Sequence, residues 1–203
     1  MKFNCVIDTS SSIYLYRVHY NRKPLLTYLK SVVNLVISSE VSKEMTDHFI
    51  EGMPTIQERQ KYITTVRRHS MPEYERRLFG RTYAAREKNK GEIDNFVVAI
   101  DQMHHFRKIG FIFLTDDANC LRGILKDCME SFPTVRIWTS YEVVLFFYIE
   151  GIIPSIDLAN DAIADLISST APALAARSQE FTQKLIKLRA DYNSRLKTIS
   201  KIL

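Results

Sequence analysis

The sequence predicts an α/β protein, a three-layer α/β/α fold with a central parallel sheet, followed by C-terminal helices. Short apolar runs rich in β-branched and aromatic residues alternate with longer segments of helical pattern. Hydroxyl and acidic residues follow several of these runs, at the point where a strand passes into a helix. Gly and Pro number only six each, which is typical of an ordered, helix-rich chain.

Each predicted element follows from its local pattern. Ser39 and Thr139-Ser140 are suitable N-caps, and Gly151 is a suitable helix end. The predicted strands are Phe3–Ile7, Val32–Ser38, Phe111–Leu114 and Val135–Trp138. The predicted helices are Ser12–Tyr20, Leu25–Ser31, Glu40–Met53, Glu92–Asp101, Ala118–Met129 and Tyr141–Glu150, with a break at Asn21–Pro24.

Two regions interrupt or follow this alternation. Residues 54–90 read as a basic insertion of two or three helices with breaks at Ser70–Pro72 and Gly80. After Pro154, apolar residues from Phe181 to Leu203 recur at spacings of three and four, which predicts a helix with one apolar stripe. The sequence does not decide whether that stripe packs against the sheet domain, a second subunit or a partner protein. We therefore expect a domain over residues 1–153 and a helical extension over residues 154–203.

The charge of the chain is uneven. Its net charge is +5, yet the stretch from Arg59 to Lys90 holds ten Lys or Arg against three Glu. Aromatic residues lie between these arginines, a pattern typical of nucleic-acid binding but also of the inner face of a helix. The candidate nucleic-acid contacts are Arg67, Arg68, Arg76, Arg77, Arg81, Lys88 and Lys90.

Several classes of protein lack their signals in this sequence. No apolar run approaches the roughly 20 residues that span a bilayer, and the start has no signal-peptide-like core, so we expect a cytoplasmic protein without a membrane span. Cys5, Cys120 and Cys128 are an odd number without CxxC spacing, which favours reduced core thiols. No Walker loop, GxGxxG or paired-His zinc motif is present.

Acidic residues fall at matching places in the strand-helix pattern. Asp8 follows the first strand, and Thr115-Asp116-Asp117 follow the Phe111–Leu114 strand. Further acids stand at helix starts, namely Glu40 and Glu44 in one helix and Glu92 and Asp94 in another. Each has a simpler role as an N-cap or as a charge favoured by the helix dipole. Brought together, they would need cations, and their hard oxygen ligands favour Mg²⁺ or Mn²⁺.

Four stretches in order, VIDTSSSIYL, ISSEVSKEM, KGEIDNFVVAIDQ and FLTDDANCLR followed by VRIWTSYEVV, resemble the landmarks of PIN-domain nucleases, a family that includes VapC-like ribonucleases. The resemblance covers Phe3–Ile153. It implies that Asp8, Glu44, Asp94 and Asp117 are catalytic and that these residues with Asp116 bind the metal. The implied secondary contacts are Ser10, Glu92 and Thr115, and the choice within Asp116/Asp117 and Glu92/Asp94 stays open.

The resemblance implies a metal-dependent endoribonuclease, with RNA as its substrate and the basic insertion holding the RNA backbone. By family analogy it also suggests a toxin-type role with a cognate inhibitor protein, and a homodimer is compatible with the sequence.

Two other classes remain open. Asp8-Thr9-Ser10-Ser11-Ser12 fits the DxSxS motif of von Willebrand A binding modules, although Asp117 stands where their later TDG motif has Gly. The third alternative is a catalytically inactive PIN-like scaffold that acts through its C-terminal helix.

Overall fold

The computed structural model describes residues 3–47, 61–85, 87–106, 110–117, 120, 131–132, 134–170 and 179–203. The chain divides into two compact units. Unit 1 comprises Met1–Ile13 and Lys30–Trp138, and unit 2 comprises Tyr14–Leu29 and Thr139–Leu203. The predicted fold class is confirmed, because a central parallel sheet is flanked by helices, consistent with a three-layer α/β/α fold. The boundary expected near residue 153 stays a prediction.

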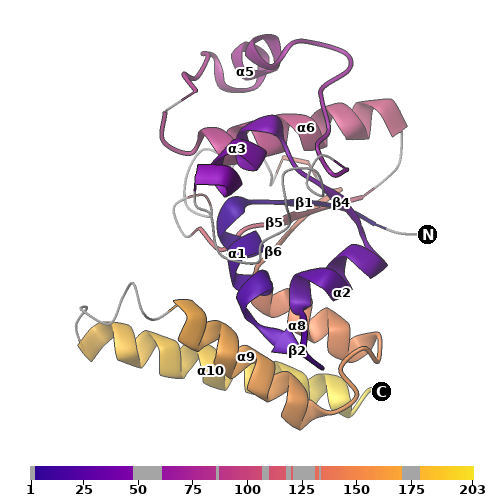
Figure 1. Ribbon diagram of the computed structural model, residues 1–203, viewed down its shortest axis with the longest axis vertical. Coiled ribbons are helices and arrows are strands. Elements are labelled where there is room, and N and C mark those ends of the chain that lie inside the picture. Colours follow the sequence, from indigo (N-terminus) through magenta and orange to yellow (C-terminus); the bar gives the residue numbers. More distant parts are fainter. Residues whose placement is uncertain are drawn as a thin grey trace. The chain divides into compact units, whose positions relative to one another are not determined.

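Unit 1 is organised around a parallel sheet of strand order β4-β1-β5-β6 (Figure 1). Its strands are β1 (Asn4–Ile7), β4 (Asn34–Val36), β5 (Phe111–Leu114) and β6 (Val135–Trp138), which confirms the four predicted strands. β4 is shorter than the predicted Val32–Ser38, because Val32 still belongs to the preceding helix. β1 and β5 are buried along their whole length, as expected of central parallel strands. Ile7 pairs with Leu114, so these two strands end level with each other.

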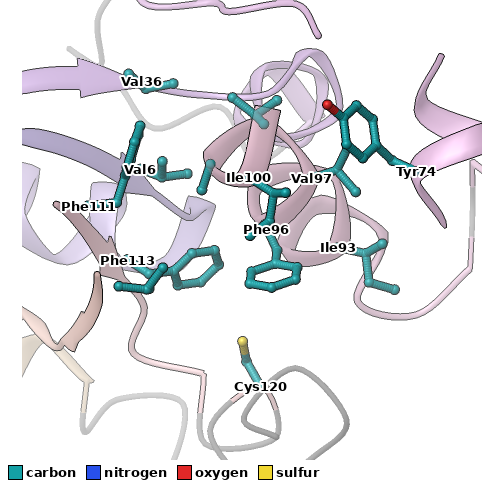
Figure 2. Packing of buried hydrophobic residues seen from close by; sticks show 13 residues of the cluster. Val6, Val36, Tyr74, Ile93, Phe96, Val97, Ile100, Phe111, Phe113 and Cys120 are labelled. Atoms are coloured by element: carbon teal, nitrogen blue, oxygen red, sulfur yellow. The ribbon is translucent and has the colours of Figure 1, made fainter. Parts of the chain in front are cut away.

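Helix α6 (Lys90–Phe106) packs against β1 and β5, and α3 (Ser39–Asp47) and α5 (Met71–Phe79) pack against α6. Its buried face carries Phe96, Val97 and Ile100, which meet Phe111 and Phe113 of β5 in the hydrophobic core (Figure 2). The apolar period of the sequence predicted this face, although α6 begins two residues earlier and runs five residues further than expected. The position of α6 decides where its first turn lies relative to the strand ends.

The basic insertion contains one helix within its described part. Pro72 lies in the first turn of α5, and Gly80 ends the helix in the left-handed conformation at φ 74°. The two breaks predicted from the sequence therefore lie at the two ends of α5. The described stretches on either side, 61–70 and 80–85, are irregular apart from one parallel bridge between Ile37 and Ile63. The insertion is thus less helical in this part than expected.

In the described part of the chain, unit 2 contains the hairpin β2 (His19–Tyr20) and β3 (Lys23–Pro24), most of α2, and the helices α8, α9 and α10. α1 (Thr9–Arg17) and α2 (Leu25–Val32) each run across the division between the units. Helix α9 packs against both α8 and α10. The remaining bounds are α8 (Ser140–Ile149), α9 (Ile156–Thr170) and α10 (Gln179–Ser200).

The segment 18–24 differs from the sequence prediction. The first helix was expected to reach Tyr20 and to be followed by a break, but it ends at Arg17 and a short hairpin follows. Asn21 and Arg22 both have positive φ, 46° and 63°, as a two-residue type I′ hairpin turn requires. The NRKP sequence was interpreted as a break because a hairpin this short has no alternating pattern.

Some expectations lie outside the described residues. They include residues 48–53 of the third predicted helix, most of the predicted helix Ala118–Met129, and Cys128. Cys5 and Cys120 are free and buried, and burial raises the pKa of both thiols. Among the described residues, no helix combines the length and the apolarity needed to cross a membrane.

Glu142 joins α8 to α10 inside unit 2. Its Oε2 accepts hydrogen bonds from the amide (2.8 Å) and the hydroxyl (2.5 Å) of Thr139, which caps α8. Its Oε1 accepts from the Tyr192 hydroxyl (2.5 Å) and from Arg195 (2.9 Å) on α10. Tyr192 and Leu196 of the apolar stripe are buried, so the stripe has partners within unit 2.

Replacement of Glu142 by Gln is expected to destabilise the chain by about 1–3 kcal/mol at neutral pH, because charge-assisted hydrogen bonds are lost. Burial raises the pKa of Glu142, but the bonds from Thr139, Tyr192 and Arg195 outweigh it and leave the pKa lowered from 4.5. A lowered pKa contributes stability above the unfolded value that is lost as the pH falls. The difference in Tm between wild type and Glu142→Gln should therefore shrink between about pH 7 and about pH 3. Exposed Glu150→Gln is the control, and an equal gap at both pH values would contradict the assignment.

Candidate active site

The level ends of β1 and β5 bring Asp8 and Thr115 side by side. The Asp8 amide donates to the Leu114 carbonyl (3.1 Å), and the Thr115 amide donates to Trp138 (2.9 Å), so both residues continue the strand ladder by one step. Across this edge the Thr115 hydroxyl donates to Asp8 Oδ2 at 2.5 Å. The repeated strand-acid pattern of the sequence therefore converges on one edge of the sheet.

Asp8 is a buried carboxyl group, 3% exposed, at the start of α1. Its Oδ1 accepts from the Ser11 amide (2.7 Å), and its Oδ2 accepts from the Ser10 hydroxyl (3.0 Å) as well as from Thr115. Burial raises its pKa to about 6 even though these hydrogen bonds favour the ionised form. Asp8 thus caps α1 and is also a carboxylate whose charge is incompletely compensated.

Glu44 reaches the same edge from α3. Its Oε2 accepts from the Thr9 hydroxyl at 2.7 Å. A Cβ atom at Gly91 would lie 2.6 Å from Glu44 Oε1, so the carboxylate rests directly on the backbone of the first turn of α6. Any side chain at position 91 would displace Glu44, which explains a glycine within this helix.

Glu92 lies next to Gly91 and belongs to the same group of acids. Its pKa is raised to about 7, first by burial and then by the negative charges of Asp8, Glu44 and Asp117. Asp116 adds to the group because its Oδ2 accepts from the Ser11 hydroxyl (2.7 Å) and its charge raises the pKa of Asp8. We call Asp8, Glu44, Glu92, Asp116 and Asp117 the acidic cluster.

Asp94, the third acid implied by the resemblance, lies in a different group of charges. It is buried and forms an ion pair with Lys90 at 3.0 Å, and Lys90 is also paired with the buried carboxylate of Glu75 on α5. Burial raises the pKa of Asp94 to about 6, Lys90 opposes this, and Glu75 and Glu40 add to it. The structure therefore brings Glu92 to the acidic cluster and places Asp94 in an ion network between α5 and α6.

Lys90 had been expected to contact RNA, but its ammonium group is buried in that network. The other basic candidates, Arg67, Arg68, Arg76, Arg77, Arg81 and Lys88, are exposed. Arg77 pairs with Glu73 at 2.7 Å, and Arg81 pairs with Glu87 at 2.6 Å while covering the Tyr83 ring. The aromatic residues of the insertion are turned mostly inward, since Tyr74 is buried and Phe79 and Tyr83 pack against the core.

Asn95 is a site residue that the sequence reading missed. It is fully buried, its Nδ2 donates to the Ile7 carbonyl (2.8 Å), and its Oδ1 accepts from the Ser38 amide (2.8 Å). It ties α6 to the ends of β1 and β4, beside the acidic cluster. Its signal was a polar residue within the apolar run that follows Asp94, because buried amides usually satisfy backbone groups.

The donor chemistry of the acidic cluster fits a hard divalent cation. Every candidate ligand is a carboxylate or hydroxyl oxygen, and the negative charges of neighbouring acids raise the pKa of both Asp8 and Glu92. In the part of the chain that the structure describes, no three acids, histidines or cysteines are close enough to form a ready metal-binding group. A cation would therefore have to draw these carboxylates closer together.

In metal-free protein, Glu92 is expected to make stability fall as the pH rises. Its folded pKa of about 7 lies above its ordinary value of 4.5, so its contribution to stability is complete below about pH 4.5 and is lost as the pH rises through about 7. Glu92→Gln should raise Tm by about 2–4 °C, or about 1 kcal/mol, at about pH 8 and leave it unchanged at about pH 5. Thermal melts in chelator test this, with Glu150→Gln as control. A gain of the same size at both pH values would show that Glu92 is not crowded by the other acids.

Comparisons of the chain with protein-family models, with curated proteins and with solved structures found no match. The resemblance of its four motifs to PIN-domain nucleases stays a prediction.

Proposed function

We propose that the chain is a divalent-metal-dependent endoribonuclease that cleaves phosphodiester bonds in RNA. The observation that supports this most is the acidic cluster, in which carboxyl groups from four separate stretches act on one another at the carboxyl end of a parallel sheet. Ligands of α/β proteins commonly bind at that end of the sheet. Carboxylates that raise one another's pKa are typical of sites that bind a divalent cation, and metal-dependent phosphodiester hydrolysis is a reaction that uses such a site.

Mg²⁺ or Mn²⁺ held by Asp8, Glu44, Asp116 and Asp117 would supply a Lewis acid that stabilises charge on the phosphate and lowers the pKa of a water molecule. The hydroxyl groups around the cluster fix the carboxylates in place. Thr9 holds Glu44, Ser11 holds Asp116, and Ser10 and Thr115 hold Asp8. These hydrogen bonds limit the conformations of the carboxylates, which would still have to move closer together around a cation.

Glu92 is our candidate for the group that accepts a proton from the attacking water. Its pKa of about 7 in the metal-free chain places it between its two protonation states near neutral pH, where a general base is most effective. Its position in the first turn of α6 next to Gly91 places it beside Glu44. Asp117, which acts on Glu92, would be a metal ligand in this scheme.

The proposal includes RNA as substrate and the exposed arginines of the insertion as contacts to its backbone. A toxin-type role in the cytoplasm, a cognate inhibitor protein and a homodimer belong to the same proposal by family analogy. The single-metal binding module of the von Willebrand A type is less well supported. Ser12, the last residue of its DxSxS pattern, donates its hydroxyl to the Asp8 backbone carbonyl at 2.8 Å.

Substitution within the first turn of α6 distinguishes the two candidate acids. Glu92→Gln and Asp8→Asn are expected to lower Mn²⁺-dependent cleavage of single-stranded RNA by more than about 100-fold, because each removes a ligand or proton acceptor. Asp94→Asn is expected to keep cleavage within about tenfold while lowering stability by about 1–3 kcal/mol, because Lys90 loses a buried partner. Cleavage assays and thermal melts of the same preparations test both, with Glu150→Gln as control.

The opposite result is equally clear. If Asp94→Asn loses cleavage at unchanged Tm while Glu92→Gln keeps it, the third acid is Asp94, as the resemblance implies. If the wild-type chain cleaves no RNA with Mn²⁺ or Mg²⁺, the nuclease proposal fails and the inactive scaffold is favoured.

Contacts between the insertion and the RNA backbone predict a salt effect. Replacing four arginines by Gln should weaken binding of single-stranded RNA and reduce the slope of log K against log salt by up to about 3, since each phosphate contact contributes about 0.7. Binding is measured with the Asp8→Asn chain, so that the RNA stays intact. An unchanged slope would mean that the insertion is ordinary surface. The test set is Arg67, Arg68, Arg76 and Arg77, and a control set of exposed charges is Arg17, Arg22, Lys187 and Arg189.

A further inference from the structure

A cavity of about 310 Å³ lies in unit 1 between α5, α6 and the loop before α5. No residue of the acidic cluster lines it. Its volume is at the lower end of the range for small-molecule sites, about 300–1,000 Å³, so it suits a single small molecule. The cavity therefore needs an explanation separate from the candidate active site.

The inner wall of the cavity is apolar and aromatic. Tyr74 and Ile100 are 4% and 2% exposed, and Leu78 and Phe132 are half-buried beside them. Tyr74 and Ile100 both belong to the hydrophobic core of unit 1 (Figure 2). The Phe132 ring packs edge-on against Phe96 at 5.9 Å, which holds it in place. Rigid rings of this kind offer a surface on which a flat heterocycle can stack.

The mouth of the cavity is basic. Arg68, Arg77, His69 and His104 line it, and Arg68, Arg77 and His104 are solvent-exposed. No carboxylate lines the cavity, and within the described residues Arg68 makes no salt bridge. Arg77 is paired with Glu73, outside the lining, at 2.7 Å. The charge arrangement thus favours a ligand with an apolar, flat part inside and an anionic group at the entrance.

Asp101 fixes the backbone at the mouth of the cavity. Its carboxylate is buried and accepts hydrogen bonds from the backbone amides of Arg67 (2.9 Å) and Arg68 (3.0 Å) and from the Tyr74 hydroxyl (2.8 Å). These bonds fix the loop and the Tyr74 ring against α6. The cavity is therefore preformed, which lowers the entropic cost of binding.

We propose that this cavity binds a nucleoside monophosphate unit, with the base against Phe132 and the phosphate at Arg68. The ligand is either a free mononucleotide or one nucleotide of an RNA strand, since both combine a flat base with a phosphate group. Inorganic phosphate alone would contact only the basic residues at the mouth of the cavity. An unphosphorylated nucleoside would contact only the aromatic and apolar residues of its inner wall. The inference does not rest on the proposed nuclease function, because it concerns binding to residues outside the acidic cluster.

Calorimetric titration of the full chain with AMP, UMP, adenosine and inorganic phosphate tests the proposal. Mononucleotides are expected to bind more tightly than either part alone. Arg68→Ala should weaken mononucleotide binding about tenfold or more, as expected for loss of a charge-assisted contact. Phe132→Leu should weaken mononucleotide binding but leave phosphate binding unchanged. Arg189→Ala, which removes an equally exposed charge from α10, should change neither.

The proposal is overturned if no mononucleotide binds more tightly than about 1 mM, or if Arg189→Ala weakens binding as much as Arg68→Ala. A second experiment distinguishes a free mononucleotide from a nucleotide of RNA as the ligand. It uses the Asp8→Asn chain so that the RNA stays uncleaved. Competition between mononucleotide and RNA supports an RNA nucleotide in the cavity, and mononucleotide binding without competition supports a free nucleotide. Since binding is read without cleavage, an inactive enzyme would leave this result intact.

Discussion

The buried amide of Asn95 is the constraint on which the rest of unit 1 depends. It bridges the Ile7 carbonyl at the end of β1 and the Ser38 amide after β4, and it belongs to α6. These two hydrogen bonds fix both the height and the rotation of α6 over the strand ends. Gly91 and Glu92, three to four residues earlier on the same helix, are thereby presented to Asp8 and Glu44. Together with the pairing of Lys90 and Glu75, this bridge adds directional contacts to the hydrophobic packing of α6 on the sheet.

Unit 1 contains two different arrangements of buried charged residues. Between α5 and α6, Lys90 lies between Glu75 and Asp94, so that a cation accompanies the anions. At the strand ends, the acids of the cluster accept hydrogen bonds from hydroxyl groups, and their charges raise the pKa of Asp8 and Glu92. The first arrangement joins two helices, and the second stores repulsion. Such stored repulsion is more typical of functional sites than of structural ones.

The sequence predicted the four strands and the acids beside them because both depend on short-range pattern. Asp8 and Thr115 follow apolar runs directly, and parallel strands bring such positions to one edge. The choice between Glu92 and Asp94 could not be made in the same way. Residues two apart on a helix point in widely different directions, so the choice depends on how α6 is rotated about its axis. That rotation is set by Asn95 and by the pairing of Lys90 with Glu75, which are contacts between segments far apart in the chain. The hairpin at residues 19–24 was missed because it is too short for any periodicity.

Asp101 holds the loop before α5 through main-chain amides, and this has a consequence for how the protein can diversify. An amide at position 67 or 68 donates its hydrogen bond whichever residue stands there, proline excepted. The backbone path of the loop therefore does not depend on which side chains stand at positions 67 and 68. Natural variation or laboratory selection can exchange the arginines for other residues and retune what the neighbouring cavity recognises, while the scaffold beneath keeps its shape.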